Sequence, residues 1–194
     1  MKQRFAPALN TLRKLFESAS TSLRIPIRFA LIGGLAVSAW GVVRATQDID
    51  LLADSDPSPL SNLALRKRLQ DFLEQRDCTA EWRVGDPDDP IPLLLRLGVH
   101  RPVALVTDIL WAHKKWHREA LSRRVTLKIS RLEIFVLHPE DLILMKLEAG
   151  GPQDLLDVEA LLSNPPPELD LKRLKRRTVQ LGLGAAELDR CLRR

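Results

Sequence analysis

Two aspartates separated by a single isoleucine, Asp48 and Asp50, are the first candidates for chemistry in this sequence. Side chains of a β-strand alternate between its two faces, so both carboxylates are expected on the same side of a strand. Like charges in this arrangement repel each other unless a cation lies between them, and Mg²⁺ is a common partner of carboxylate oxygens. The pair therefore predicts a magnesium site, although a solvated strand end produces the same pattern.

A pair of glycines, Gly33 and Gly34, follows an apolar run shortly before the aspartates. Glycine at a strand-to-helix turn lets the backbone approach a ligand closely, and the start of the next helix offers free N–H groups to phosphate. A tight turn with nothing bound would have the same sequence. The spacings of a dinucleotide-binding fingerprint and of a P-loop are both absent. A phosphate-binding turn followed by a metal-binding pair is what a nucleoside triphosphate with Mg²⁺ requires.

Other polar residues are less specific. Arg44 and Thr46 precede the aspartates, where they would either contact a nucleotide or lie in a solvated loop. His113 and His117 have the helical spacing of a zinc site, but Lys114 follows His113 where a zinc protease carries glutamate, so metal binding is not favoured there.

These residues need a sheet and helices to position them. Apolar alternation predicts strands at 28–32, 48–53, 79–84, 93–99, 102–110, 125–129 and 132–137. Helical spacing predicts helices in the first 20 residues and at 35–42, 59–74 and 111–120. After residue 138 the pattern is helical only, at 139–150, 153–162 and 169–181. We expect an α+β fold with a mixed sheet flanked by helices, in which 1–137 form the core and 138–194 a helical C-terminal region.

The sequence resembles the nucleotidyltransferase superfamily with the polymerase-beta-like fold, in its minimal bacterial branch. The resemblance rests on the Gly-Gly pair followed by "RATQDIDLL", on "LVTDIL" at 105–110, and on "HPEDLILMKLEAG" with "QDLLDVEALL" within 138–162. This last segment is similar to the AbiEii-type toxin nucleotidyltransferases. The similarity spans about residues 29–162.

The resemblance implies a role for each matched residue. Gly33 and Gly34 would hold the triphosphate, Asp48 and Asp50 would bind Mg²⁺, and Asp108 would complete the metal site and help to deprotonate the acceptor. Lys146 would face phosphate, with Asp154 and Asp157 as polar partners. Arg44 and Thr46 are further candidates for nucleotide contacts. Relatives commonly carry arginine in the turn that reads Gly150-Gly151-Pro152 here, so one expected cation is missing.

The implied reaction moves a nucleoside monophosphate from an NTP such as ATP to a hydroxyl group. The acceptor would be RNA, in particular the 3′ end of tRNA, or a protein or a small molecule, and an antitoxin protein is a further implied partner. The alternative is a non-catalytic module that binds a nucleotide or a protein partner and retains the fold.

Composition limits the class of protein. The 194 residues carry a net charge of +5, and 171–194 contain eight basic and two acidic residues, a balance of +6. Such a segment either attracts nucleic acid or forms a solvated helix face. No apolar stretch is long enough for a membrane span, and Cys78 and Cys191 lack metal-ligand spacing. A cytoplasmic protein is therefore expected.

Overall fold

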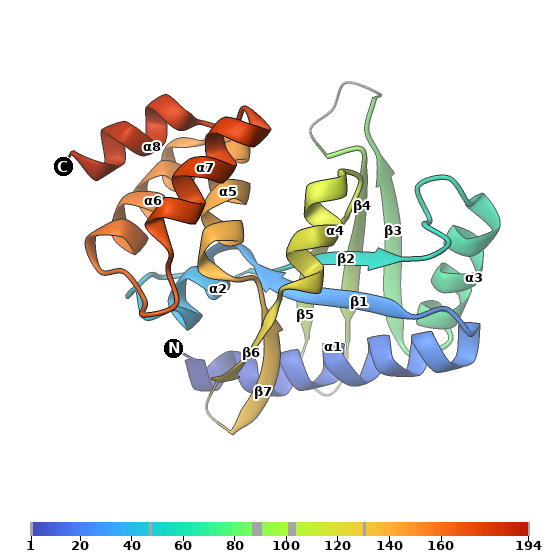
Figure 1. Ribbon diagram of the computed structural model, residues 1–194. Coiled ribbons are helices and arrows are strands. Elements are labelled where there is room, and N and C mark those ends of the chain that lie inside the picture. The colour runs from blue at the N-terminus through green and yellow to red at the C-terminus, as the bar shows by residue number, and fades with distance from the viewer. Residues whose placement is uncertain (1, 47, 87–90, 101–103, 130, 194) are drawn as a thin grey trace.

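The structure, a computed structural model, describes residues 2–46, 48–86, 91–100, 104–129 and 131–193 (Figure 1). Within these ranges, seven strands form one mixed sheet in the order β3-β4-β5-β2-β1-β7-β6. The strands are β1 Ile27–Ile32, β2 Ile49–Ser55, β3 Cys78–Val84, β4 Leu93–Val99, β5 Leu105–Trp111, β6 Val125–Ile129 and β7 Leu132–Val136. The predicted fold class, a mixed sheet flanked by helices, is confirmed.

Helices occur before, between and after the strands. They are α1 Lys2–Leu23, α2 Gly33–Ala39, α3 Leu63–Glu74, α4 Lys115–Ser122, α5 Pro139–Ala149, α6 Pro152–Ser163, α7 Leu171–Leu181 and α8 Ala185–Leu192. Figure 1 shows α1 running along the sheet, while α5 to α8 gather into a separate stack beside one end of it. The predicted division into 1–137 and 138–194 stays a prediction.

Strand β2 lies inside the sheet, antiparallel to β1 on one side and parallel to β5 on the other. Alternation along β2 sends Ile49, Leu51 and Ala53 to one face and the residues between them to the opposite face. The first face is covered by α1, where Phe16 packs on Phe29 of β1 with ring centroids 5.1 Å apart. Burial of this face fixes the register of β2, so Asp50 and Asp54 must face the other way.

The C-terminal helices begin and end at the residues that the sequence indicates. Proline occupies the first position of α5 and of α6, where its missing N–H costs nothing. Helix α5 ends at Gly150, whose φ of +65° is the left-handed conformation that glycine adopts readily. The sequence analysis missed α8, which carries the buried Leu188 and Cys191.

Several predicted boundaries differ from the observed ones. Helix α2 begins at the two glycines rather than after them, and β5 continues to Trp111, so α4 starts only at Lys115. Asp48 precedes β2 instead of lying within it. Part of the predicted strand at 102–110 lies outside the described residues. Among the described helices, none combines the length and the apolar character that crossing a membrane requires.

Candidate functional site

Asp50 and Asp108 are directly paired across the parallel strands β2 and β5. Residues paired in this way project to the same face of a sheet, so the two carboxylates share the face opposite α1. The next pair on this face is Leu52 and Leu110. Asp48, in the exposed segment just before β2, lies close enough to raise the pKa of Asp50 by charge repulsion. The structure therefore brings the three predicted aspartates into one neighbourhood.

The pKa of Asp50 is raised from 3.8 to about 6. Burial is the main cause, because it disfavours the charged carboxylate, and the negative charges of Asp48 and Asp108 add to it. The positive charges of Lys146 and Arg44 oppose the rise without cancelling it. This pKa indicates that more positive charge near Asp50 would stabilise its carboxylate.

Asp108 carries an unsatisfied oxygen. Its Oδ1 atom is buried and has no hydrogen-bond partner among the described residues, whereas Oδ2 lies 3.6 Å from Nη1 of Arg96 on the neighbouring strand β4. A buried carboxylate oxygen without a partner costs free energy that a cation would recover.

The fit of Mg²⁺ to these carboxylates depends on how many ligands the protein supplies. In the described part of the chain, no three His, Cys, Asp or Glu side chains are grouped so that they could hold a metal ion by themselves. The predicted trio of Asp48, Asp50 and Asp108 is therefore not a complete set of ligands. Mg²⁺, however, is usually bound by one or two carboxylates together with water and substrate phosphates. The paired Asp50 and Asp108, one with a raised pKa and one with an orphaned oxygen, fit an ion that arrives with a phosphate ligand.

Gly33 lies directly against the Asp50 carboxylate. Its φ is +64°, and a Cβ atom added to it would stand 2.1 Å from Oδ2 of Asp50. A Cβ on Gly34 would stand 1.2 Å from Nη1 of Arg44 and 3.2 Å from Oγ1 of Thr46. The two glycines thus let Asp50 approach from one side and Arg44 with Thr46 from the other, which gathers four of the predicted nucleotide-binding residues around Asp50.

Lys146 is buried among acidic residues of α6. Its Nζ atom lies 2.6 Å from Oδ1 of Asp154 and 2.9 Å from Oδ2 of Asp157, and only 8% of the residue is exposed. Oδ1 of Asp157 also forms an ion pair with Nε of Arg44, at a distance of 2.7 Å. Asp157 therefore joins the loop that carries Arg44 to the C-terminal helices, and both cations nearest Asp50 are already paired with carboxylates.

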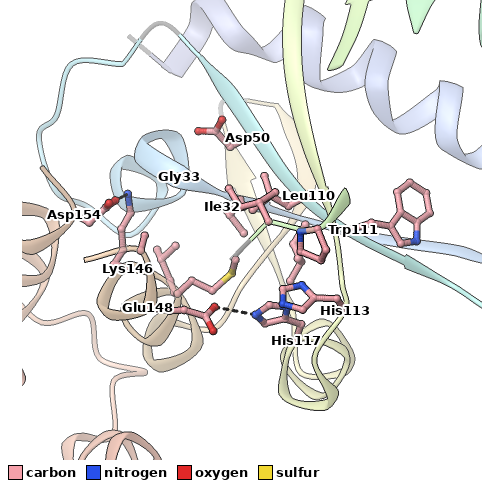
Figure 2. Close-up of a pocket in the computed structure, with 16 residues that line it drawn as sticks. Ile32, Gly33, Asp50, Leu110, Trp111, His113, His117, Lys146, Glu148 and Asp154 are labelled. Atoms are coloured by element: carbon pink, nitrogen blue, oxygen red, sulfur yellow. Dashed lines mark hydrogen bonds and ion pairs between the residues drawn. The ribbon is translucent and has the colours of Figure 1, made fainter. Parts of the chain in front are cut away.

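A cavity of about 320 Å³ extends from Asp50 along the same face of the sheet. Figure 2 shows Lys146 and Asp154 on one side of it and His113 and His117 on the other. Most of the remaining lining is apolar, contributed by Ile32, Leu52, Ile91, Pro92, Leu110, Leu142, Met145 and Ala149. The site thus combines a charged rim with an apolar interior.

The histidine side of the cavity is fixed by Glu148 at the end of α5. Its two carboxylate oxygens contact Nζ of Lys114 at 2.5 Å and Nε2 of His117 at 3.0 Å. These two hydrogen bonds hold the pKa of Glu148 below its usual value, although burial acts in the opposite direction. The predicted i, i+4 histidines therefore meet a carboxylate and a lysine, and no metal-holding group occurs there among the described residues.

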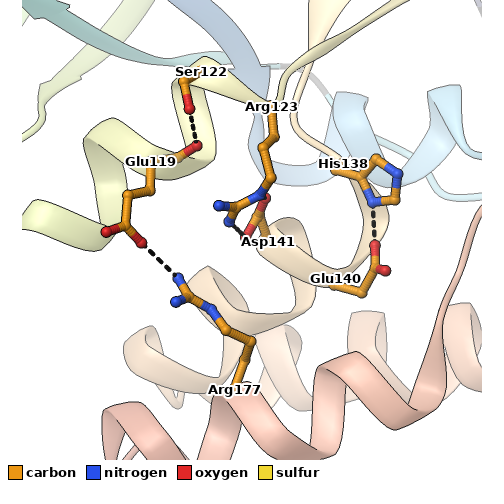
Figure 3. Close-up of polar contacts among 7 residues, drawn as sticks. All are labelled: Glu119, Ser122, Arg123, His138, Glu140, Asp141 and Arg177. Carbon is orange, nitrogen blue, oxygen red and sulfur yellow. Dashed lines mark hydrogen bonds and ion pairs between the residues drawn. The ribbon is translucent and has the colours of Figure 1, made fainter.

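Further ion pairs connect α4 to the C-terminal helices (Figure 3). Arg123, at the end of α4, donates to both oxygens of Asp141 on α5, at 2.6 and 3.2 Å. Arg177 of α7 donates to Glu119 of α4 at 3.2 Å. Together with Glu148, these contacts hold α4 and α5 in place on either side of the cavity.

Sequence reasoning missed two residues of this site, Arg96 and Glu148. Arg96 is the single charge within the apolar strand Leu93–Val99, a signal that was available in the sequence. Glu148 had no such signal, because an acidic residue near the end of an amphipathic helix is usually solvated.

No protein-family model and no curated protein matches the chain. Among solved structures, an antigenic nucleotidyltransferase-like protein from Paracoccidioides brasiliensis is similar over 95% of this chain and 92% of that one, with 19% identity and a TM-score of 0.48. ANT(2'')-Ia in complex with adenylyl-2''-tobramycin is similar over 94% and 93%, with 17% identity and a TM-score of 0.40. The Cid1 poly(U) polymerase is similar over 84% of this chain and 39% of that one, with 14% identity and a TM-score of 0.41. The function proposed below rests on the site itself.

Proposed function

We propose that this chain is a Mg²⁺-dependent nucleotidyltransferase that moves a nucleoside monophosphate from an NTP to a hydroxyl acceptor. The observation that carries the proposal is the carboxylate pair, in which Asp50 has a pKa of about 6 and lies beside Asp108 with its unpartnered Oδ1. Such a pair requires a cation, and a metal ion ligated in part by phosphate supplies one.

Some side chains of the site would bind the metal and the phosphates, and one would take part in proton transfer. Asp50 and Asp108 would hold Mg²⁺ together with phosphate and water, and Asp48 would contribute a further carboxylate from the loop before β2. When bound, Mg²⁺ supplies positive charge to the phosphate oxygens around the reacting phosphorus. Gly33 and Gly34 would let the triphosphate approach the backbone.

The cations that flank Asp50 would act on the phosphates. Arg44 and Lys146 would offset the negative charge that moves to the leaving pyrophosphate, and Thr46 would donate a hydrogen bond. Asp154 would keep the Lys146 ammonium in position, since Oδ1 of Asp154 already lies 2.6 Å from Nζ of Lys146. Asp108, on the strand farther from the glycines, would orient the acceptor hydroxyl and draw its proton.

The finer assignment concerns the acceptor. The resemblance of 138–162 to AbiEii-type toxins favours RNA, in particular the 3′ end of tRNA, and an antitoxin protein as partner. The exposed basic residues Lys172, Lys175 and Arg176 of α7 are compatible with an RNA acceptor. A protein or a small molecule is the alternative acceptor. We also propose a cytoplasmic location.

A non-catalytic binding module is the second candidate. It is favoured by one observation, namely that Lys146 and Arg44 are both paired with Asp157 instead of being available to a phosphate. In an enzyme these ion pairs would have to be shared with the substrate.

Incubation with labelled NTPs separates the two candidates. Native protein and Asp50→Asn are each incubated with Mg²⁺, one labelled NTP, and total RNA or cell extract. An enzyme labels an acceptor only in the native form, whereas a binding module raises the melting temperature with NTP and Mg²⁺ without labelling. If native protein neither labels an acceptor nor responds to NTP, the transferase is excluded and only a module that binds a protein partner remains.

A further inference from the structure

The cavity beside Asp50 has two chemically different ends. Gly33, Asp50 and Lys146 form its charged rim, and His113, His117 and Glu148 form the opposite end. We propose that this cavity holds the nucleoside part of the NTP and that His113 contacts the base and contributes to the choice among NTPs. This inference rests on the proposed function, because it takes the carboxylate rim as the phosphate and metal site.

The lining decides which part of an NTP enters. Apolar side chains, among them Leu52, Leu110 and Met145, make up most of the walls. Moving a pyrophosphate into such surroundings would remove its hydration without replacing it, which is very costly for a charged group. A ribose with a planar base gains from the same apolar walls. The phosphates therefore stay at the rim, and the nucleoside points inward.

Asp108 supports the same orientation. It belongs to the carboxylate pair but is not one of the residues that line the cavity, whereas Leu110, the next residue of β5 on this face, is. An in-line displacement needs the acceptor and the leaving group on opposite sides of the phosphorus. The acceptor would then reach the phosphorus from the Asp108 side, beside Arg96, while the nucleoside occupies the cavity.

At the end of the cavity formed by His113, His117 and Glu148, His113 is the residue suited to contact a base. Both oxygens of Glu148 are already engaged by Lys114 and His117, so this carboxylate holds the wall in place. The half-buried His113 ring meets His117 edge-on, with centroids 4.8 Å apart and planes at 81°. Burial lowers the pKa of His113, so its imidazole is neutral near pH 7 and offers one donor and one acceptor.

Binding measurements with and without a nucleoside test this proposal. Calorimetry in Mg²⁺ compares ATP, GTP, CTP and UTP with inorganic tripolyphosphate, which carries the phosphates alone. We expect the preferred NTP to bind about tenfold or more tightly than tripolyphosphate, as the burial of a base in an apolar pocket implies. If tripolyphosphate binds as tightly as every NTP, the nucleoside has no pocket and the inference is wrong.

Variants that fill the cavity locate the nucleoside. Met145→Trp should lower NTP affinity to that of tripolyphosphate and leave tripolyphosphate binding unchanged. Ala149→Trp should lower NTP affinity in the same way. Because Ala149 is exposed, this substitution should not disturb folding. Leu156→Trp, on an exposed part of α6 away from the cavity, is the matched control. An unchanged NTP affinity in both filled variants would overturn the proposal.

His113→Phe tests base contact separately, since it keeps a ring and removes both nitrogens. The ratio of affinities between the best and worst NTP should fall several-fold, with tripolyphosphate binding unchanged. An unaltered ratio would exclude His113 as a specificity residue. Failure of the proposed function looks different, because a chain without the phosphate and metal site would bind neither tripolyphosphate nor any NTP in Mg²⁺, and a non-catalytic module would bind them without labelling an acceptor.

Discussion

The Oδ2 atom of Asp50 lies 2.1 Å from the point at which a Cβ atom on Gly33 would stand. No side chain at position 33 can coexist with the observed Asp50 carboxylate, so the glycine and the aspartate form one unit. The chain also passes position 33 with a φ of +64°, which a residue with a Cβ adopts at a cost.

Gly33→Ala should therefore displace Asp50 and abolish the binding of Mn²⁺, used as a probe for Mg²⁺. Gly182→Ala is the control, because its φ is +66° and nothing lies within 4 Å of its added Cβ. Both variants should lose about 1–2 kcal/mol of stability from the backbone conformation. Metal titration by electron paramagnetic resonance separates them, and equal Mn²⁺ affinity in the two variants would contradict the close packing of Gly33 on Asp50.

The raised pKa of Asp50 predicts a pH dependence of stability without metal. Because the folded pKa of about 6 exceeds the unfolded value of 3.8, the native state binds more protons between these values. The native protein should lose stability as pH rises through this window, by no more than about 3 kcal/mol. Asp50→Asn should remove this loss, so its melting temperature should equal or exceed that of the native protein above pH 6.

Below about pH 4 the two melting curves should converge, because Asp50 is then protonated in both the folded and unfolded states. Mn²⁺ affinity of the native protein should fall as pH drops through about 6, since protons compete for the same carboxylate. A pH-independent difference between the two proteins would show that Asp50 does not titrate in this range.

Arg96 competes with metal for Asp108. Its guanidinium lies 3.6 Å from Oδ2, and both side chains are partly exposed, so the ion pair contributes little to stability. Arg96→Ala should raise Mn²⁺ affinity about two- to fivefold. This change corresponds to the free energy that a partly exposed ion pair contributes. Arg83→Ala is the control, because Arg83 pairs with Glu81 on β3. Weaker Mn²⁺ binding in Arg96→Ala would mean that Arg96 supports the site instead.

Lys146→Ala should reduce stability as well as activity. It leaves Asp154 without this cation and the buried Asp157 with Arg44 alone, which is expected to cost up to about 3–5 kcal/mol. Lys67→Ala removes an ion pair of the same 2.6 Å length on an exposed helix face and should change stability little. Urea unfolding of both variants tests the difference, and a stable Lys146→Ala protein would argue against the buried network.

The basic face of α7 predicts salt-dependent RNA binding if RNA is the acceptor. Neutralising Lys172, Lys175 and Arg176 should reduce the slope of log affinity against log salt by up to about 2. Arg177 is left intact because it pairs with Glu119. The same change at the exposed Lys14, Lys67 and Lys128, outside α7, should leave the slope nearer to that of the native protein. Equal slopes in all three proteins would favour a protein or small-molecule acceptor.

Local periodicity was sufficient to predict most of the elements and the face of Asp50. It worked because apolar alternation decides which side of a strand is buried. It could not provide the pairing of Asp50 with Asp108, because strands far apart in sequence pair through the whole fold. The contact between Arg44 and Asp157 is another such long-range relation. The predicted strand includes Asp48, but this residue precedes the observed β2, because the pairing with β5 begins only at Ile49 and the pairing with β1 only at Asp50.

The missed helix α8 has a similar explanation. Ala185–Leu192 is short and follows Gly182 and Gly184, both of which have positive φ. Such a segment gains most of its helical stability from packing, here through Leu188 and Cys191. Packing against other helices is not visible in eight residues of sequence.

Asp48 and Asp50, on either side of Ile49, differ in how firmly the chain holds them. Asp50 belongs to a strand that is hydrogen-bonded on both sides, while Asp48 precedes the strand in an exposed segment. Amide hydrogen exchange should therefore be slow at Asp50 and fast at Asp48. An ion shared by both would have one rigid ligand, Asp50, and one flexible ligand, Asp48. The conformational entropy lost when the ion binds would therefore come mainly from the segment before β2. Its amides should become protected only when the metal and the nucleotide are both present.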